Sequence, residues 1–174
     1  MSDLRYPIGK FLHDPVANLE EVAAWIDQID ALPGDLRAVV TGLRDDQLDT
    51  RYRPEGWTLR QVIHHLGDSH MNSIVRFKLA LTEENPTIRP YDEKGWAEQA
   101  DYRAFPPAHG LDFLQLLHER WAILLRSLSP ADLARTYVHP VSGIKRLDWT
   151  VGMYAWHGRH HLAHILGTIE REGW

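Results

Sequence analysis

Four histidines lie within eight residues of the stretch "WHGRHHLAHI", residues 156–165. On a helix, positions four residues apart share one face with their Cβ atoms about 5 to 6 Å apart, so two imidazoles at that spacing can bind one metal ion. The stretch contains two such pairs, His157 with His161 and His160 with His164. The residue types and their spacing therefore indicate a metal site, and they leave open which pair would form it.

The apolar residues of the same segment favour the first pair. At about 100° per residue, His161 lies roughly 70° and His157 roughly 110° from the centre of the apolar stripe. His164 lies roughly 130° away, and His160 is nearly opposite. The interior of a helical bundle can therefore be reached from His157 and His161. The stripe consists of Leu147, Val151, Tyr154, Leu162, Ile165 and Ile169.

A second group of histidines occurs about ninety residues earlier, in "WTLRQVIHHLGDSHMN". A catalytic metal site needs at least one more protein ligand and open positions for water, and His64, His65 and His70 are the candidates. His64 and His65 flank the apolar stripe of this segment on opposite sides, so spacing barely separates them. His70 points into the stripe, where a hydrogen-bonded core histidine is equally expected. The HExxH motif of zinc proteases is absent from the chain.

Composition limits the remaining possibilities. With 44% hydrophobic and 25% charged residues in 174, the chain is typical of one globular domain spanning residues 1–174. The net charge of −5 argues against nucleic acid and membrane surfaces as partners, so we expect a small-molecule substrate. Without cysteine, any metal must be held by nitrogen and oxygen. We find no signal-peptide pattern and no apolar stretch of membrane-spanning length, and we expect a cytoplasmic protein.

Four helices must position these side chains. Hydrophobic periodicity predicts helices over residues 18–43, 59–81, 111–128 and 148–171. Thr58 and Asp148 are the expected N-caps of the second and fourth helices, and Pro33 with Gly34 should divide the first helix into two pieces.

The connections between the helices complete the predicted fold. We expect an irregular arm over residues 1–15, a long loop over residues 82–110 and a small hairpin around Gly143. The predicted fold is all-α, a four-helix bundle with a long crossover loop. In such bundles ligand sites are built from side chains on facing helices.

The sequence resembles the DinB superfamily of four-helix bundles, and closely the YfiT-like subgroup of metal-dependent hydrolases. The similarity covers nearly the whole chain, and two of its stretches contain the histidines discussed above. The matching stretches are "YPIGKF" (6–11), "GWTLRQVIHHLGDSHMNS" (56–73), "RFKLALTEENPTIRPYDEKGWAE" (76–98), "YAWHGRHHLAHI" (154–165) and the terminal "GW".

This resemblance implies a divalent metal, Zn²⁺ or Ni²⁺, held by three histidines, and a homodimer. The family pattern takes one ligand from the histidine eight places after the tryptophan, which is His65 when counted from Trp57. The other two come from an HxxxH motif in the last helix, which we assign to His157 and His161. His160 and His164 remain the alternative pair.

Three neutral imidazoles leave open positions on a divalent cation, where a bound water has its pKa lowered toward neutrality. The sequence therefore predicts a metal-dependent hydrolase in which metal-bound water is the nucleophile, with no catalytic side chain assigned. Asp68, one turn after His65, could accept a hydrogen bond from a ligand imidazole.

Two other functions stay open. A thiol S-transferase would use a low-molecular-weight thiol such as bacillithiol, because the chain has no cysteine of its own. Alternatively, the protein is a non-catalytic dimer that binds a metal or another ligand.

Overall fold

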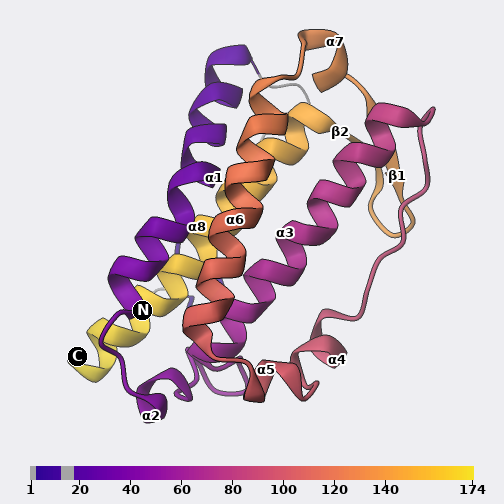
Figure 1. Ribbon diagram of the computed structural model, residues 1–174. Helices are drawn as coiled ribbons and strands as arrows, with labels where there is room; N and C mark the ends of the chain where they lie inside the picture. Colours follow the sequence, from indigo (N-terminus) through magenta and orange to yellow (C-terminus); the bar gives the residue numbers. More distant parts are fainter. Residues whose placement is uncertain (1–2, 13–17) are drawn as a thin grey trace.

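The computed structural model describes residues 3–12 and 18–174, so residues 1–2 and 13–15 of the predicted arm lie outside the described part. Four long helices form a bundle, as predicted (Figure 1). Within the described ranges, no helix has both the length and the apolar character needed to cross a membrane. The long helices are α1 (Leu19–Val40), α3 (Leu59–Thr82), α6 (Pro107–Arg126) and α8 (Leu147–Glu172).

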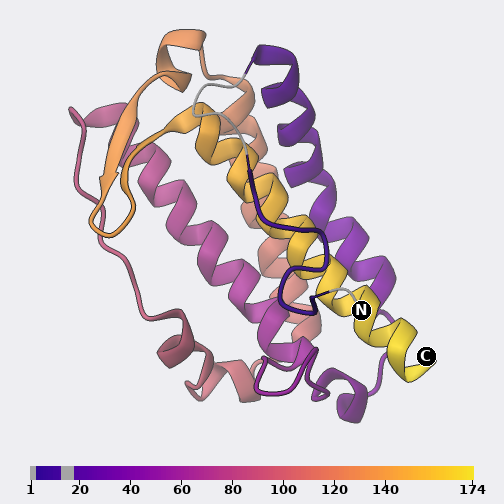
Figure 2. The ribbon, with the colours of Figure 1, turned by 180° about the vertical axis from the view of Figure 1, so that it is seen from behind.

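Helices that follow one another in the chain are not always neighbours in space. α1 and α3 each pack against both α6 and α8, so α1 and α3 lie on a diagonal of the bundle. α1 and α8 run in one direction and α3 and α6 in the other (Figures 1 and 2). Because α3 and α6 are parallel, the chain between them must return along the length of the bundle. The long loop predicted after residue 82 provides this return.

Local sequence sets where the helices begin. The Thr58 hydroxyl accepts a hydrogen bond from the Gln61 N–H, and the Gln61 side chain accepts one from the Thr58 N–H, which confirms Thr58 as the N-cap of α3. The prediction that Asp148 caps α8 was wrong, because the N-cap is Arg146. Asp148 instead lies in the first turn, where a carboxylate stabilises the positive end of the helix dipole. It also accepts a 2.7 Å hydrogen bond from the Arg146 guanidinium.

α1 is one continuous helix of 22 residues, so the prediction that Pro33 and Gly34 divide it was wrong. Proline has no backbone N–H and cannot donate to the carbonyl four residues earlier, which is that of Ile29. In this bundle the ring of His118 donates to the Ile29 carbonyl instead. Pro33 is itself buried among the core residues of the helix. Packing and a substitute donor thus allow the helix to continue through the proline.

Short elements occupy the connections. α2 lies in the segment between α1 and α3, and α4 and α5 lie in the long return loop. The predicted hairpin is confirmed, with an antiparallel pair of strands that turns before Gly143, whose φ is +77°. These elements are α2 (Asp45–Leu48), α4 (Glu93–Ala97), α5 (Asp101–Ala104), α7 (Pro130–Leu133), β1 (Thr136–His139) and β2 (Gly143–Arg146).

The described part of the N-terminal arm, residues 3–12, lies across α8 (Figure 2). The Gly9 carbonyl accepts a 3.2 Å hydrogen bond from the indole N–H of Trp156. The ring of Phe11 packs edge-on against Trp149, with the ring centroids 5.4 Å apart. The arm therefore covers a face of α8 close to the histidine stretch.

Two clusters of buried apolar side chains fill the bundle, one toward each end. The first includes Ile29, Phe77, Trp121 and Tyr154, and the second includes Leu32, Leu66, Leu114 and Ile165. On α3, α6 and α8, buried histidines occupy the positions between the two clusters. The core is thus divided at mid-height by a layer of imidazole rings. The layer contains His65, His70, His118 and His161, with the partly buried His157 beside them.

Candidate metal centre

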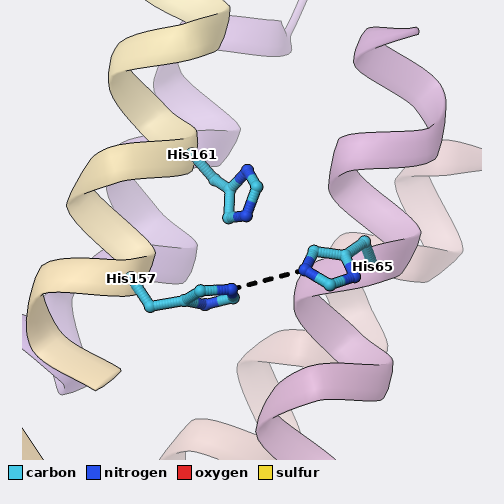
Figure 3. Close-up of side chains that lie close together, drawn as sticks. All are labelled: His65, His157 and His161. Atoms are coloured by element: carbon cyan, nitrogen blue, oxygen red, sulfur yellow. Dashed lines mark hydrogen bonds between the residues drawn. The ribbon is translucent and has the colours of Figure 1, made fainter. Parts of the chain in front are cut away.

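Three histidines of this layer point their rings toward one another (Figure 3). One ring nitrogen each of His65, His157 and His161 lies within 4.8 Å of the other two. Nε2 of His65 and Nε2 of His157 are 3.3 Å apart, although the two residues are 92 positions apart in the sequence. The structure therefore brings together, from α3 and α8, the three residues that the sequence suggested as ligands.

The arrangement fits a divalent cation. Two nitrogens that bind one zinc ion at about 2.0 to 2.1 Å with tetrahedral angles lie about 3.3 Å apart. The Nε2 atoms of His65 and His157 have this spacing. Burial lowers the pKa of His65 to about 3 and holds the pKa values of His157 and His161 well below the usual value. The rings are therefore neutral, which is the form that binds a metal.

One polar atom at this site lacks a partner. Nδ1 of His65 is buried and has no hydrogen-bond partner among the described residues. A buried polar atom without a partner costs free energy unless it has a function. Because nothing fixes a proton on Nδ1, either nitrogen of His65 can carry it, and Nε2 is free to serve as a ligand.

Trp57 closes one side of the three rings. Its ring centroid lies 4.4 Å from that of His65 and 6.2 Å from that of His161. Trp57 directly precedes the capping residue of α3, so the start of the helix holds the indole in place. The indole shields the imidazoles from water on this side, and a substrate must approach from elsewhere.

A cavity of about 300 Å³ borders His157 on the side toward the hairpin. Arg76 and Lys145 provide positive charge there. The Arg76 guanidinium donates a 3.1 Å hydrogen bond to the Tyr154 hydroxyl, and the Lys145 ammonium lies 4.7 Å from the centroid of Trp149. Glu93 lines the same cavity, and burial raises the pKa of its carboxyl group. The cavity thus has room for a small molecule beside His157, with two cationic side chains available to an anionic group. None of the three histidines lines a larger hollow, of about 610 Å³, near the start of α3.

The other two histidines of α3 have different partners. Nε2 of His64 lies 3.1 Å from the Phe105 carbonyl, and the ring lines a separate cavity. His70 is fully buried, with Nδ1 2.7 Å from Nε2 of His118 and Nε2 3.0 Å from Nδ1 of His157. His70 is thus a hydrogen-bonded core histidine, which was one of the two roles that the sequence left open.

His160 and His164, the alternative pair, make aromatic contacts. The ring of His160 stacks on Trp156 with centroids 4.6 Å apart, and that of His164 stacks on Tyr52 with centroids 3.9 Å apart. Among the residues that the structure describes, the only group of three potential metal ligands is the one that contains His65. No third ligand therefore joins the alternative pair in the described chain.

Asp68 does not contact a ligand imidazole, so the hydrogen bond suggested by the sequence is not formed. Its Oδ2 atom accepts a 2.6 Å hydrogen bond from the hydroxyl of Tyr102 on α5. Burial raises the pKa of Asp68, while this hydrogen bond opposes the rise. The carboxylate therefore ties the return loop to α3.

The sequence reasoning missed His118, which is fully buried on α6. It lies seven residues after Leu111 and three before Trp121, on the apolar stripe of that helix. A buried polar ring at such a position is expected to have specific hydrogen-bond partners. The periodicity of α6 could therefore have revealed it.

Known proteins resemble this chain over nearly its whole length. The sequence profile of the DinB superfamily matches residues 28–165. A relative from Oceanobacillus iheyensis is 52% identical over 170 residues, which cover 98% of both chains. A relative from Bacillus mycoides is 52% identical over 100% of both chains, and each relative is named a "Putative metal-dependent hydrolase".

A solved structure shares both the fold and the sequence. YfiT from Bacillus subtilis is described as "a probable metal-dependent hydrolase with an unusual four-helix bundle topology". It matches with a TM-score of 0.96 and 47% identity, over 98% of each chain. The diagonal placement of α1 and α3 is therefore part of a shared fold.

Proposed function

Since the chain belongs to the DinB superfamily, we propose that it is a metal-dependent hydrolase whose Zn²⁺ or Ni²⁺ ion is held by His65, His157 and His161. The observation that carries the proposal is the convergence of three imidazole nitrogens, within 4.8 Å of one another, from two helices. The names given to the relatives support the same class of activity.

A bound divalent cation supplies a Lewis acid that polarises oxygen groups and makes water a nucleophile near neutral pH. The chain's own residues prepare the site for it. Burial keeps the three imidazoles neutral, so each retains a lone pair. Trp57 excludes water from one side, and the cavity beside His157 leaves an approach for substrate. A set of three protein ligands with open positions is typical of catalytic sites rather than structural ones.

Arg76 and Lys145 are the residues that would orient an anionic substrate in the cavity. Lys78 offers a matched control, because it lies on the same helix as Arg76 but is exposed and does not line the cavity. We expect Arg76→Gln and Lys145→Gln to raise KM for an anionic ester more than for a neutral ester. Lys78→Gln should change neither value. Equal effects on both esters would contradict this role.

A thiol S-transferase is the second candidate, and the same cavity favours it. Its positive charge suits an anionic low-molecular-weight thiol of the bacillithiol type, which would supply the sulfur that the cysteine-free chain lacks. A thiol nucleophile can be activated by metal coordination.

An activity comparison tests the two candidates. Metal-loaded protein is given ester and amide substrates, and separately an electrophile with bacillithiol, with metal-stripped protein and His65→Ala as controls. Metal-dependent turnover of an ester or amide without thiol would support the hydrolase. Turnover only with thiol would support the transferase, and no turnover by protein with full metal occupancy would favour a non-catalytic binding protein.

A homodimer is also part of the proposal. Phe113, Leu116 and Ile123 leave 42%, 67% and 73% of their surface exposed on α6. Their spacing places them on one face of the helix, which could pack against a second copy. Light scattering of the wild type and of Leu116→Glu tests this. We expect the wild type to be a dimer and the variant, with a charge on this face, to be a monomer. A monomeric wild type at micromolar concentration would contradict it.

A further inference from the structure

Pro33 begins a chain of contacts that ends at the candidate metal centre. Because Pro33 cannot donate to the Ile29 carbonyl, that carbonyl remains available to a side chain. Nδ1 of His118 lies within hydrogen-bond distance of it. A carbonyl oxygen only accepts hydrogen bonds, so Nδ1 of His118 must carry a proton.

This proton determines the proton positions on the next two rings. A neutral imidazole has one donor nitrogen and one acceptor nitrogen, so Nε2 of His118 accepts from Nδ1–H of His70, at 2.7 Å. Nε2 of His70 then accepts from Nδ1–H of His157, at 3.0 Å. Nε2 of His157 is left with a free lone pair, and this nitrogen faces Nε2 of His65 at 3.3 Å.

The opposite direction of hydrogen bonding would need a cationic His118, with protons on both ring nitrogens. His118 and His70 are fully buried, and the edges and faces of Trp121 and Tyr154 surround them. Burial lowers the pKa of His118 to about 4. Since an apolar environment disfavours the charged ring, His118 is neutral at neutral pH, and the hydrogen bonds run in the direction described above.

We infer that His118 and His70 are positioning residues, whose hydrogen bonds fix His157 in the tautomer that presents an unprotonated Nε2 to the candidate metal centre. The inference rests on the proposed function, since orienting His157 matters only if His157 binds a metal ion. Residues that hydrogen-bond to metal ligands orient them, and their loss typically costs about 10- to 100-fold in metal affinity.

The other two ligands lack such an arrangement in the described part of the chain. Nδ1 of His65 has no partner, and Nδ1 of His161 lies 3.4 Å from Nδ1 of His164, a longer contact than those that link His118, His70 and His157. His157 is therefore the preorganised ligand, and the tautomers of His65 and His161 can adjust when a cation binds.

The tautomer of His157 can be measured directly. Long-range ¹H–¹⁵N spectra of metal-free wild-type protein at pH 7.5 report which ring nitrogen carries the proton, and the spectrum of His157→Gln assigns the signals. We expect the proton on Nδ1. A proton on Nε2 would overturn the inference.

Zinc affinity, measured by competition with a chromophoric chelator, tests whether the hydrogen-bond chain contributes to metal binding. His118→Phe keeps an aromatic ring but removes both nitrogens, and we expect affinity to fall by about 10- to 100-fold. His118→Gln keeps an acceptor near the position of Nε2 and should bind zinc nearly as well as the wild type. His160→Phe is the matched control, because His160 is a buried histidine that takes no part in the hydrogen bonds between His118, His70 and His157.

The outcomes separate this inference from the proposed function. Wild-type affinity in a folded His118→Phe protein, or an equal loss in His160→Phe, would overturn the positioning role. If His118→Phe fails to fold, His118→Gln decides the matter. The role is supported if this protein keeps both the Nδ1–H tautomer of His157 and zinc affinity, as expected, or loses both together. It is refuted if the protein loses one of the two and keeps the other. A wild-type protein that binds no zinc but shows the Nδ1–H tautomer would contradict the proposed metal site and still support the hydrogen-bond chain.

Discussion

The two histidine pairs on α8 have the same spacing and lie on the same helix, yet their surroundings differ. His157 and His161 face α3, which adds His65 as a third nitrogen donor. His160 and His164 face aromatic side chains and the N-terminal arm, with Tyr6 5.9 Å from the ring of His160. An HxxxH pair therefore becomes a candidate metal site only when another element supplies a further ligand.

The second pair also shows what a histidine does without a metal. Its rings stack on Trp156 and Tyr52, and aromatic pairs of this kind contribute about 0.5 to 1.5 kcal/mol beyond the area that they bury. Nδ1 of His160 and Nε2 of His164 have no hydrogen-bond partner in the described chain. These residues therefore act mainly as apolar rings that seat the arm and the loop before α3.

The largest expected effect separates the two pairs directly. We expect the double variant His157→Ala, His161→Ala to lose stoichiometric zinc or nickel binding, because one imidazole cannot hold the ion in the site. The double variant His160→Ala, His164→Ala should keep one metal per chain. Elemental analysis after dialysis measures both, with circular dichroism as the folding control. If the first variant retained the metal and the second lost it, His160 and His164 would be the ligands in place of His157 and His161.

A somewhat smaller effect is expected from the third ligand. His65→Ala leaves two ligands on one helix, so metal affinity should fall by about 100-fold or more, since each protein ligand contributes strongly to binding. His64→Ala is the matched control on the neighbouring position and should bind metal like the wild type. Competition titration measures both variants. Equal losses would mean that α3 contributes through its packing and not through one nitrogen.

The sequence predicted those features of the candidate site that depend on one helix at a time. Periodicity located α3, α6 and α8, and the angular position of His157 and His161 on α8 favoured them over the second pair. The choice of His65 over His64 needed the family pattern, because both lie at similar angles from the apolar stripe.

Features that depend on contacts between helices were missed or predicted wrongly. Pro33 was expected to divide α1, because helix propensity takes no account of a donor from another helix. His118 supplies that donor, and it was overlooked because its partners lie on α1 and α3. For Asp68 the sequence offered a hydrogen bond to a ligand imidazole only as a possibility. Its partner Tyr102 could not be foreseen, since the position of Tyr102 follows from the path of the return loop.

Acid should destabilise the metal-free protein partly through the second pair. Burial lowers the pKa values of His160 and His164 to about 4, whereas an unfolded histidine has a pKa of about 6.5. Between these values the unfolded chain binds protons that the folded chain does not, so the free energy of unfolding falls as the pH falls from about 6.5 toward 4. Each histidine contributes a slope of at most about 1.4 kcal/mol per pH unit.

Urea unfolding at several pH values checks this contribution. We expect the double variant His160→Gln, His164→Gln to show a shallower loss of stability between pH 6.5 and pH 4.5 than the wild type. Zinc content at pH 7.5 should be the same in both proteins. An unchanged slope would mean that the second pair is already exposed to water in solution.

The smallest expected effect concerns the arm that covers the second pair. Trp156→Phe removes the indole N–H that donates to the Gly9 carbonyl but keeps a ring to stack on His160. Such a hydrogen bond contributes about 0.5 to 1.5 kcal/mol, and its partial exposure places the expected loss at the lower end, about 0.5 kcal/mol. The free energy of unfolding in urea measures the loss, and zinc affinity should not change. The arm meets the second pair, and both of its rings contact His161. Nδ1 of His164 lies 3.4 Å from Nδ1 of His161, and the ring centroids of His160 and His161 are 5.1 Å apart. If zinc affinity fell together with the hydrogen bond of the arm, these contacts would have to couple the two pairs, and the pairs could no longer be treated as independent.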